Sequence, residues 1–185
     1  MMPEISLNIL DVAQNSVTAG SKLTIIDIAV DSQADRLSIE IIDDGKGMTR
    51  EQISRVTDPF YTTRTTRSVG LGVPFFKMAC ELTGGGFNIE STVGEGTTVS
   101  AVFGLSHIDR MPLGDIAGTF AALVGPAPDI DFLLRYSVDG RSFEADTREF
   151  RNILGDVPLD EPEVLGFIEG FIRENREECD AGVSV

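Results

Sequence analysis

The sequence has few of the residues that build metal sites and disulfide frameworks. Its 185 residues include two cysteines, Cys80 and Cys179, far apart in the chain, and a single histidine, His107. Two thiols and one imidazole are too few for a disulfide scaffold or a Cys/His zinc site within one chain. We therefore expect both cysteines to be reduced thiols and Cys80 to lie in the core.

Basic residues are also scarce. Fifteen lysines and arginines against 30 acidic residues give a net charge of −15, and a field of this sign repels nucleic acid and anionic membranes. No apolar run approaches the roughly 18 residues of a membrane span. The first seven residues lack the basic and apolar regions of a secretion signal. These absences predict a cytoplasmic protein that binds neither nucleic acid nor membranes.

The charge is distributed unevenly along the chain. Residues 1–105 carry a net charge of −5 and residues 106–185 a net charge of −10. All three lysines and most of the glycines also fall in the first part. We therefore predict one N-terminal unit over 1–105 and a small α+β extension over 106–185.

Hydrophobic periodicity predicts alternating helices and strands. In the first part we expect helices over 5–19, from 49 and over 71–83, and strands over 22–30, 36–43, 86–92 and 97–103. In the second part we expect helices over 113–124, 148–154 and 161–178, and a hairpin over 130–138 and 141–146 that adds to an edge of the sheet. Residues 55–70 show no periodicity, and a loop of this length is usually functional.

The first predicted helix carries an unusual polar stripe. Asn8, Asp11, Asn15 and Thr18 recur at helical spacing opposite the apolar face. A solvated face is one interpretation, but such faces favour Lys, Glu and Arg, and an asparagine inside a helix costs about 0.5 kcal/mol relative to alanine. Short amide and carboxylate oxygens suit a polar ligand or Mg²⁺. The stripe alone leaves both interpretations open.

A glycine-containing turn follows the second predicted strand, at residues 43–48 (DDGKGM). An Asp-Gly pair favours a hairpin turn, but a capped helix and not a strand comes next. Between a strand and a helix, bare glycine backbone can approach a flat ligand, and an aspartate can accept a hydrogen bond from an amino group. The turn is therefore a candidate ligand site.

The loop over 55–70 contains Arg55, Arg64 and Arg67 in an otherwise acidic chain and leads into Gly70 and Gly72. A solvated loop is the simple interpretation. Positive charge before a helix N-terminus also suits phosphate, because free backbone N–H groups and the helix dipole favour anions. The P-loop motif and the complete dinucleotide-binding motif are both absent, so a nucleotide would be held in another way.

Together these segments resemble the GHKL superfamily of ATPases, which includes gyrase, heat-shock chaperones, histidine kinases and mismatch-repair proteins. Residues 11–21 (DVAQNSVTAGS) resemble its N box, 43–48 the G1 box, 58–64 (DPFYTTR) the F box of histidine kinases, and 70–73 (GLGV) the G2 box, while 96–98 (GTT) match the last short motif. The motifs follow in family order over about residues 5–103. The F and G2 boxes are most similar to the histidine-kinase branch.

The resemblance implies a two-layer α/β sandwich of the Bergerat type, with helices on one face of a mixed sheet and ATP held under a lid over 55–69. By position, Asn15 is implied to bind Mg²⁺, Asp43 to accept from the adenine amino group, and Thr98 to support the adenine pocket. The other implied nucleotide-binding residues are Gly45, Gly47, Met48, Phe60, Thr63, Arg64, Arg67, Gly70, Leu71 and Gly72.

Asp11 lies four residues before Asn15, where chaperone and mismatch-repair members of the superfamily have a glutamate as general base. An aspartate carboxylate lies about 1 Å closer to the backbone, and a displacement of that size costs on the order of 10²-fold in rate. We therefore predict that Asp11 is the catalytic base and that hydrolysis is slow or depends on a partner.

Three functions remain open at this point. The favoured one is a free-standing Mg²⁺-ATP-binding domain that changes lid conformation and regulates a protein partner. The second is a protein kinase acting in trans, like anti-sigma-factor kinases: only about four residues precede the first helix, and His107 is interpreted as a linker residue, so we expect any acceptor on another protein. The third is a scaffold insensitive to nucleotide.

Residues 107–185 match none of these motifs. They resemble small ATP-binding proteins of anaerobic bacteria that are associated with iron-only hydrogenase components. This resemblance implies a role accessory to a redox enzyme, because the chain has no ligands for an iron–sulfur cluster. The last helix is a candidate surface for a protein partner or for a second copy in a homodimer.

Overall fold

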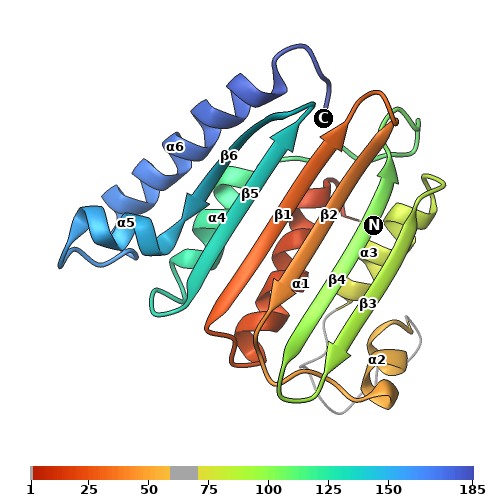
Figure 1. The fold of residues 1–185 in the computed structure, drawn as a ribbon, viewed down its shortest axis with the longest axis horizontal. Helices are drawn as coiled ribbons and strands as arrows, with labels where there is room; N and C mark the ends of the chain where they lie inside the picture. The colour runs from red at the N-terminus through yellow and green to blue at the C-terminus, as the bar shows by residue number, and fades with distance from the viewer. Residues whose placement is uncertain (1, 59–70) are drawn as a thin grey trace.

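The computed structural model describes residues 2–58 and 71–185. Its strands form one mixed sheet in the order β3-β4-β2-β1-β5-β6 (Figure 1). The strands are β1 (Leu23–Asp31), β2 (Arg36–Asp43), β3 (Gly86–Thr92), β4 (Gly96–Gly104), β5 (Asp131–Val138) and β6 (Arg141–Asp146). The helices are α1 (Ile5–Thr18), α2 (Arg50–Val56), α3 (Gly72–Glu81), α4 (Ile116–Val124), α5 (Thr147–Leu154) and α6 (Pro162–Asp180).

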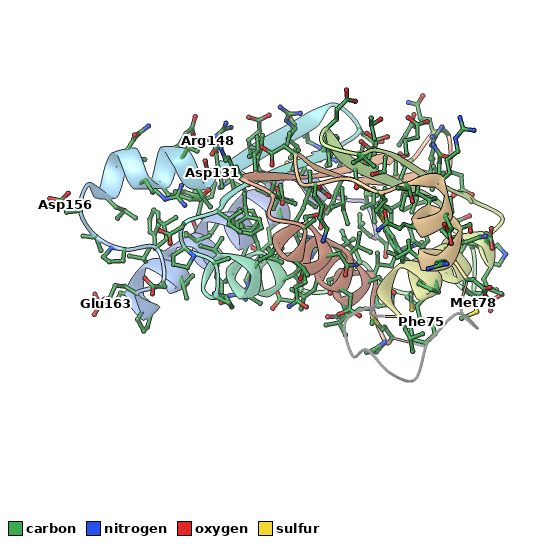
Figure 2. All side chains as sticks on the ribbon, turned by 90° about the horizontal axis from the view of Figure 1, so that it is seen from below. Phe75, Met78, Asp131, Arg148, Asp156 and Glu163 are labelled. Atoms are coloured by element: carbon green, nitrogen blue, oxygen red, sulfur yellow. The ribbon has the colours of Figure 1, made fainter. Side chains whose placement is uncertain are left out.

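The molecule has two layers. Figure 2 shows the sheet nearly edge-on, with α1, α3, α4 and α6 together on one side of it. The strand pairs are antiparallel except for β1 and β5, which run parallel. The predicted α/β sandwich, with helices on one face of a mixed sheet, is therefore confirmed.

Helix α1 forms the centre of the helix layer. Ile5, Ile9, Val12 and Ala13 are buried, as their spacing along one face of a helix predicts. The helix ends before Gly20, whose φ of 75° is readily adopted only by a residue without a Cβ atom. The predicted helix and its end are thus confirmed.

The sheet is apolar on the side of the helices, and its other side is mixed, with charged residues beside the apolar neighbours Ile25, Ile42 and Leu133. In β2 the buried positions are Leu37, Ile39 and Ile41, and they alternate with more exposed positions because successive strand residues face opposite sides. On the uncovered face, Asp27 lies directly opposite Glu40 on one side and Arg135 on the other. The core therefore lies between the sheet and the helix layer.

The C-terminal part continues the same sheet. Strand β5 pairs with β1 from Leu23↔Asp131 to Val30↔Val138, which confirms that the predicted hairpin adds to the sheet. Helix α4 packs against both α1 and α6, and the rings of Phe120 and Phe132 lie 6.3 Å apart in an edge-to-face contact. One continuous core thus contains residues from both parts. The division of the chain near residue 105 stays a prediction.

Among the helices of the described residues, none combines the length and the apolar character that crossing a membrane requires.

Candidate functional site

A pocket of about 460 Å³ lies among α1, α2 and the ends of β2 and β4. This volume lies within the range of small-molecule sites, about 300–1,000 Å³. Its apolar wall consists of Val12, Ala19, Ile41, Met48, Val56, Val73, Ile89 and Val99. Its polar lining consists of Asn15, Ser16, Thr18, Asp43, Lys46, Gln52, Arg55 and Thr97. An apolar wall with a few polar groups suits a flat ligand that carries hydrogen-bonding edges.

Asp43, the last residue of β2, is held on both carboxylate oxygens. The Ser16 hydroxyl donates to Oδ2 over 2.9 Å, and the backbone N–H of Gly45 donates to Oδ1, also over 2.9 Å. Each carboxylate oxygen can accept more than one hydrogen bond. The half-buried carboxylate therefore still offers acceptor capacity to a ligand in the pocket.

The neighbouring Asp44 binds the start of β1 and does not face the pocket. Its Oδ1 accepts hydrogen bonds from the backbone N–H groups of Lys22 and Leu23 and from the Ser21 hydroxyl, at 2.7, 3.0 and 2.9 Å. Burial acts to raise the pKa of Asp44, but these hydrogen bonds outweigh it, and the pKa lies below its ordinary value. Asp44 is not among the pocket residues; it anchors the start of β1.

The glycines of the turn make close contacts within the protein itself. A Cβ atom at Gly47, where φ is 65°, would lie 1.9 Å from the carbonyl oxygen of Thr92. A Cβ atom at Gly96 would lie 1.9 Å from the carbonyl oxygen of Asp43. At Gly45 it would lie 2.9 Å from the Cβ atom of Ala19. Because these glycines have no side chain, the turn after β2 can lie close against α1 and the β3–β4 turn. From the sequence alone, the glycines of this turn are explained only by the close approach of a ligand.

The polar stripe of α1 divides in the structure. Asn15 and Thr18 line the pocket, whereas Asn8 is only 1% exposed and its amide lies 3.5 Å from the carbonyl oxygen of Glu4. Because α3 and α4 both pack against α1, Asn8 is enclosed by protein. Neither interpretation that the sequence left open, a solvated face or a ligand-facing stripe, therefore holds at Asn8.

Asp11, on α1, lies against the first residue of α3. A Cβ atom at Gly72 would lie 2.5 Å from the Cβ atom of Asp11 and 3.3 Å from its Oδ2. Burial raises the pKa of Asp11 above its ordinary value. The carboxylate is thus partly withdrawn from water beside the first turn of α3, and its role as a base stays a prediction.

Strand β4 presents Thr97 to the pocket. Thr97 lies opposite Asp43 in the ladder and lines the same cavity, whereas Thr98 borders a shallow hollow of about 270 Å³ together with Ile42. Alternation from the buried Val99 places Thr97 on the helix side, and this signal was available in the sequence. Ser16 was also missed, because a serine next to Asn15 has no distinctive pattern.

Helix α2 supplies one side of the pocket. Its predicted capping box is present: Thr49 Oγ1 accepts from the backbone N–H of Gln52 over 3.3 Å, and Gln52 Oε1 accepts from the N–H of Thr49 over 2.8 Å. Gln52, Arg55 and Val56 then face the cavity, and Lys46 joins them from the turn. Among the described residues, two cationic side chains thus line this pocket of an acidic protein, and one of them, Arg55, is ion-paired with Glu51.

Residues 4–107, more than half of the chain, match the family model for histidine kinase-, DNA gyrase B-, and HSP90-like ATPases. The chain belongs to this ATPase family. The resemblance drawn from the sequence motifs is confirmed, and the pocket belongs to an ATP-binding domain related to those of histidine kinases.

Several relatives of this ATPase domain are named as kinases or sensors. Sporulation kinase D of Bacillus subtilis (strain 168) is 36% identical over 101 residues, which cover 53% of this chain and 19% of the relative. A putative sensor histidine kinase NtrY-like of Rickettsia felis is 28% identical over 106 residues, 57% of this chain and 17% of the relative. The non-motile and phage-resistance protein of Caulobacter vibrioides is 30% identical over 113 residues, which cover 58% of this chain and 13% of the relative. The chain therefore spans less than a quarter of the length of these relatives.

A solved structure shares the fold of this ATPase-family chain. The N-terminal domain of a DNA repair protein aligns with a TM-score of 0.52 and 14% identity, and the alignment covers 78% of this chain and 52% of that one. The alignment extends over a larger share of the chain than the family match does. At this level of identity it supports the architecture alone.

The remaining predicted site residues divide into two groups. Phe60, Thr63, Arg64, Arg67 and Gly70 lie outside the described residues. Leu71 is the N-cap of α3 and is 40% exposed, and it is not among the pocket residues. Val73, the second residue of α3, does line the pocket. The first turn of α3 thus lies at the pocket beside Asp11.

The family's usual metal, Mg²⁺, has one candidate protein ligand at the pocket. Within residues 2–58 and 71–185 no group of three His, Cys, Asp or Glu side chains is arranged to hold a metal ion. Mg²⁺ commonly keeps its waters and binds through substrate phosphates with only one or two protein oxygens. The exposed amide of Asn15 fits that chemistry.

Proposed function

We propose that the protein binds Mg²⁺-ATP in this pocket, hydrolyses it slowly and uses nucleotide binding to regulate a protein partner. The observation that carries the proposal is Asp43, whose carboxylate is fixed by Ser16 and Gly45 inside the apolar pocket. An adenine ring offers an apolar face and an amino group, so it matches this combination.

The charges around the pocket support the placement of the phosphates. Lys46 and Arg55 line the cavity, with Arg55 also ion-paired to Glu51, and the dipole at the start of α3 favours an anion. The net charge of −15 repels free anions, so these local cations matter more than they would in a neutral protein. Asn15 is the residue that would hold Mg²⁺, which would neutralise phosphate charge when bound.

Slow turnover is supported by the position of Asp11. Its short carboxylate is half-buried against Gly72 and does not line the pocket. A general base must come within hydrogen-bond reach of the proton it removes, directly or through one water. Hydrolysis would then need a shift of α1 against α3, which a bound partner could supply.

Calorimetric titration of Mg²⁺-ATP into wild type, Asp43→Asn and Asp44→Asn tests the binding site. Asp43→Asn replaces an acceptor oxygen with a donor amide facing adenine, so we expect affinity to fall at least tenfold. Asp44→Asn changes the adjacent carboxylate, which faces β1, and should retain wild-type affinity. Absence of binding by folded wild type, or equal losses in the two variants, would contradict the proposal.

A kinase acting in trans is the second candidate, because relatives of the matched region are named as kinases. Incubation of the protein and labelled ATP with a cell lysate separates the two candidates. Transfer of label to one distinct protein, abolished by Asp43→Asn, supports the kinase. Release of free phosphate with no labelled protein supports the slow ATPase.

A further inference from the structure

We propose that Ser16 is a positioning residue that sets the choice of nucleobase through Asp43. This inference rests on the proposed ATP site and goes one step beyond it. Asp43 would contact the base, while Ser16 would fix the direction in which the Asp43 carboxylate offers its acceptor oxygens.

Ser16 is enclosed by protein and aimed at Asp43. The residue is 2% exposed, and its hydroxyl lies 2.9 Å from Asp43 Oδ2. Its own backbone carbonyl accepts a hydrogen bond from the N–H of Ser21 over 3.1 Å. The last turn of α1 is therefore tied to the following loop, and the hydroxyl is held in place on a rigid element.

The two hydrogen-bond donors to the Asp43 carboxylate come from different elements of the fold. Gly45, in the turn after β2, holds Oδ1, and Ser16, on α1, holds Oδ2. A carboxylate with one donor on each oxygen cannot rotate about its last bond without losing both hydrogen bonds, and hydrogen bonds to charged groups are the strong ones. The plane of the acceptor is thus set by the contact between helix and sheet.

A fixed acceptor discriminates between purines. Adenine presents an amino group, which donates, at the position where hypoxanthine presents a carbonyl oxygen, which only accepts. An acceptor locked toward that position favours the amino group and opposes the oxygen. An acceptor free to turn can avoid the oxygen or find the neighbouring ring N–H of hypoxanthine, so discrimination falls.

Because Ser16 is buried, a water molecule cannot easily take the place of its hydroxyl once that hydroxyl is removed. Ser16→Ala should leave Asp43 held only by Gly45 and able to turn. The affinity for ATP should fall about tenfold, which corresponds to about 1.4 kcal/mol, while the affinity for inosine triphosphate should change little. The ratio of the two affinities should therefore fall by nearly the same factor.

The test is calorimetric titration of Mg²⁺-ATP and Mg²⁺-inosine triphosphate into wild type and three variants. Ser6→Ala is the matched control, because Ser6 is a fully buried serine on the same helix that bonds Glu4 and lies away from the pocket. Ser16→Thr keeps a hydroxyl and should restore selectivity, and Ser6→Ala should leave it unchanged. Thermal unfolding of each variant shows that it is folded at the titration temperature.

Two results would overturn the inference, and they are distinguishable from each other. Equal weakening of both nucleotides in Ser16→Ala, with wild type selective for ATP, would show that Ser16 only shapes the cavity and would leave the ATP site intact. Absence of ATP binding by wild type would remove the proposed function itself, and the role of Ser16 with it.

Discussion

Asp11 of α1 and Gly72 of α3 lie in direct contact: a Cβ atom at Gly72 would be 2.5 Å from that of Asp11. The bare backbone at the first residue of α3 therefore lies directly against the side chain of Asp11. The same contact half-buries the Asp11 carboxylate and raises its pKa. The predicted base and the predicted phosphate-binding helix end are thus mechanically linked, which leads to the first two predictions.

Gly72→Ala should force α1 and α3 apart. The atom nearest to the added methyl group is the Cβ atom of Asp11, which cannot swing away as the tip of a side chain can. The methyl group should therefore lower the free energy of unfolding by about 1–3 kcal/mol and weaken Mg²⁺-ATP binding. Denaturant unfolding and calorimetry measure both effects. Gly166→Ala is the control: it lies in helix α6 with open space around it, and alanine there should stabilise by about 0.5–1 kcal/mol. A Gly72→Ala variant with wild-type stability and wild-type affinity would contradict the close contact between Asp11 and Gly72.

Asp11→Asn should stabilise the protein at neutral pH and slow ATP turnover. Burial raises the folded-state pKa above 3.8, so the native state favours the protonated carboxyl, and this favourable contribution is lost as the pH rises through the folded-state pKa. Asparagine mimics the neutral form and should melt higher than wild type at pH 7, with the difference vanishing below about pH 4. Melting curves at several pH values check this. A pH-independent difference in melting temperature would contradict the first expectation, and unchanged ATP turnover in Asp11→Asn would contradict the second.

Asp44→Ala should destabilise the protein at neutral pH. Three donors at the start of β1 lose their acceptor. The two backbone donors are exposed and can bond water instead, so we expect a cost of about 0.5–1.5 kcal/mol. Because the pKa of Asp44 is lowered, the wild-type carboxylate stabilises the fold above its unfolded-state pKa, and this advantage is lost as the pH falls through the folded-state pKa. The difference in the free energy of unfolding between wild type and Asp44→Ala, measured in urea, should therefore become smaller as the pH is lowered. Asp156→Ala, at an exposed position, should show no such difference.

Much of the fold was predictable because local patterns agree with the tertiary structure. The apolar spacing of Ile5, Ile9 and Val12, the glycine after α1 and the capping box at Thr49 each depend on near neighbours in the chain. Their outcome is therefore decided before distant segments pack. The enclosure of Asn8 was not predictable in this way, because it depends on α3 and α4 packing on either side of α1.

The site was predictable in its residue types and less so in its contacts. Motif positions indicated Asn15 and Asp43, and both line the pocket. The motif placed Thr98 there, whereas the strand alternation places Thr97. Ser16 became visible only through a hydrogen bond between residues 27 positions apart, which no local pattern encodes. The glycines likewise have partners, such as Thr92 for Gly47, that only the closed structure reveals.

Cys80 should be chemically inert in the folded protein. Its thiol is fully buried, and burial raises its pKa to about 11, so the reactive thiolate is scarce at pH 8. Iodoacetamide should leave Cys80 unmodified in native protein and alkylate it once the protein is unfolded, as mass spectrometry of the digested protein would show. Rapid native alkylation would contradict the packing of α3 against the sheet.

The extension over 106–185 should be needed for the fold of residues 1–105. Strand β1 pairs with β5 along its length, and α4 packs against α1, so the isolated segment 1–105 would expose a strand edge and part of the core beside the helix that carries Asn15. We expect this segment to lack a cooperative thermal transition. In the full chain, Phe120→Ala should lower the free energy of unfolding by about 3–5 kcal/mol, because Phe120 is buried against Phe132, yet it should still bind Mg²⁺-ATP while folded. A folded, ATP-binding 1–105 segment would show instead that the boundary near residue 105 separates two folding units and that the shared sheet adds no essential stability.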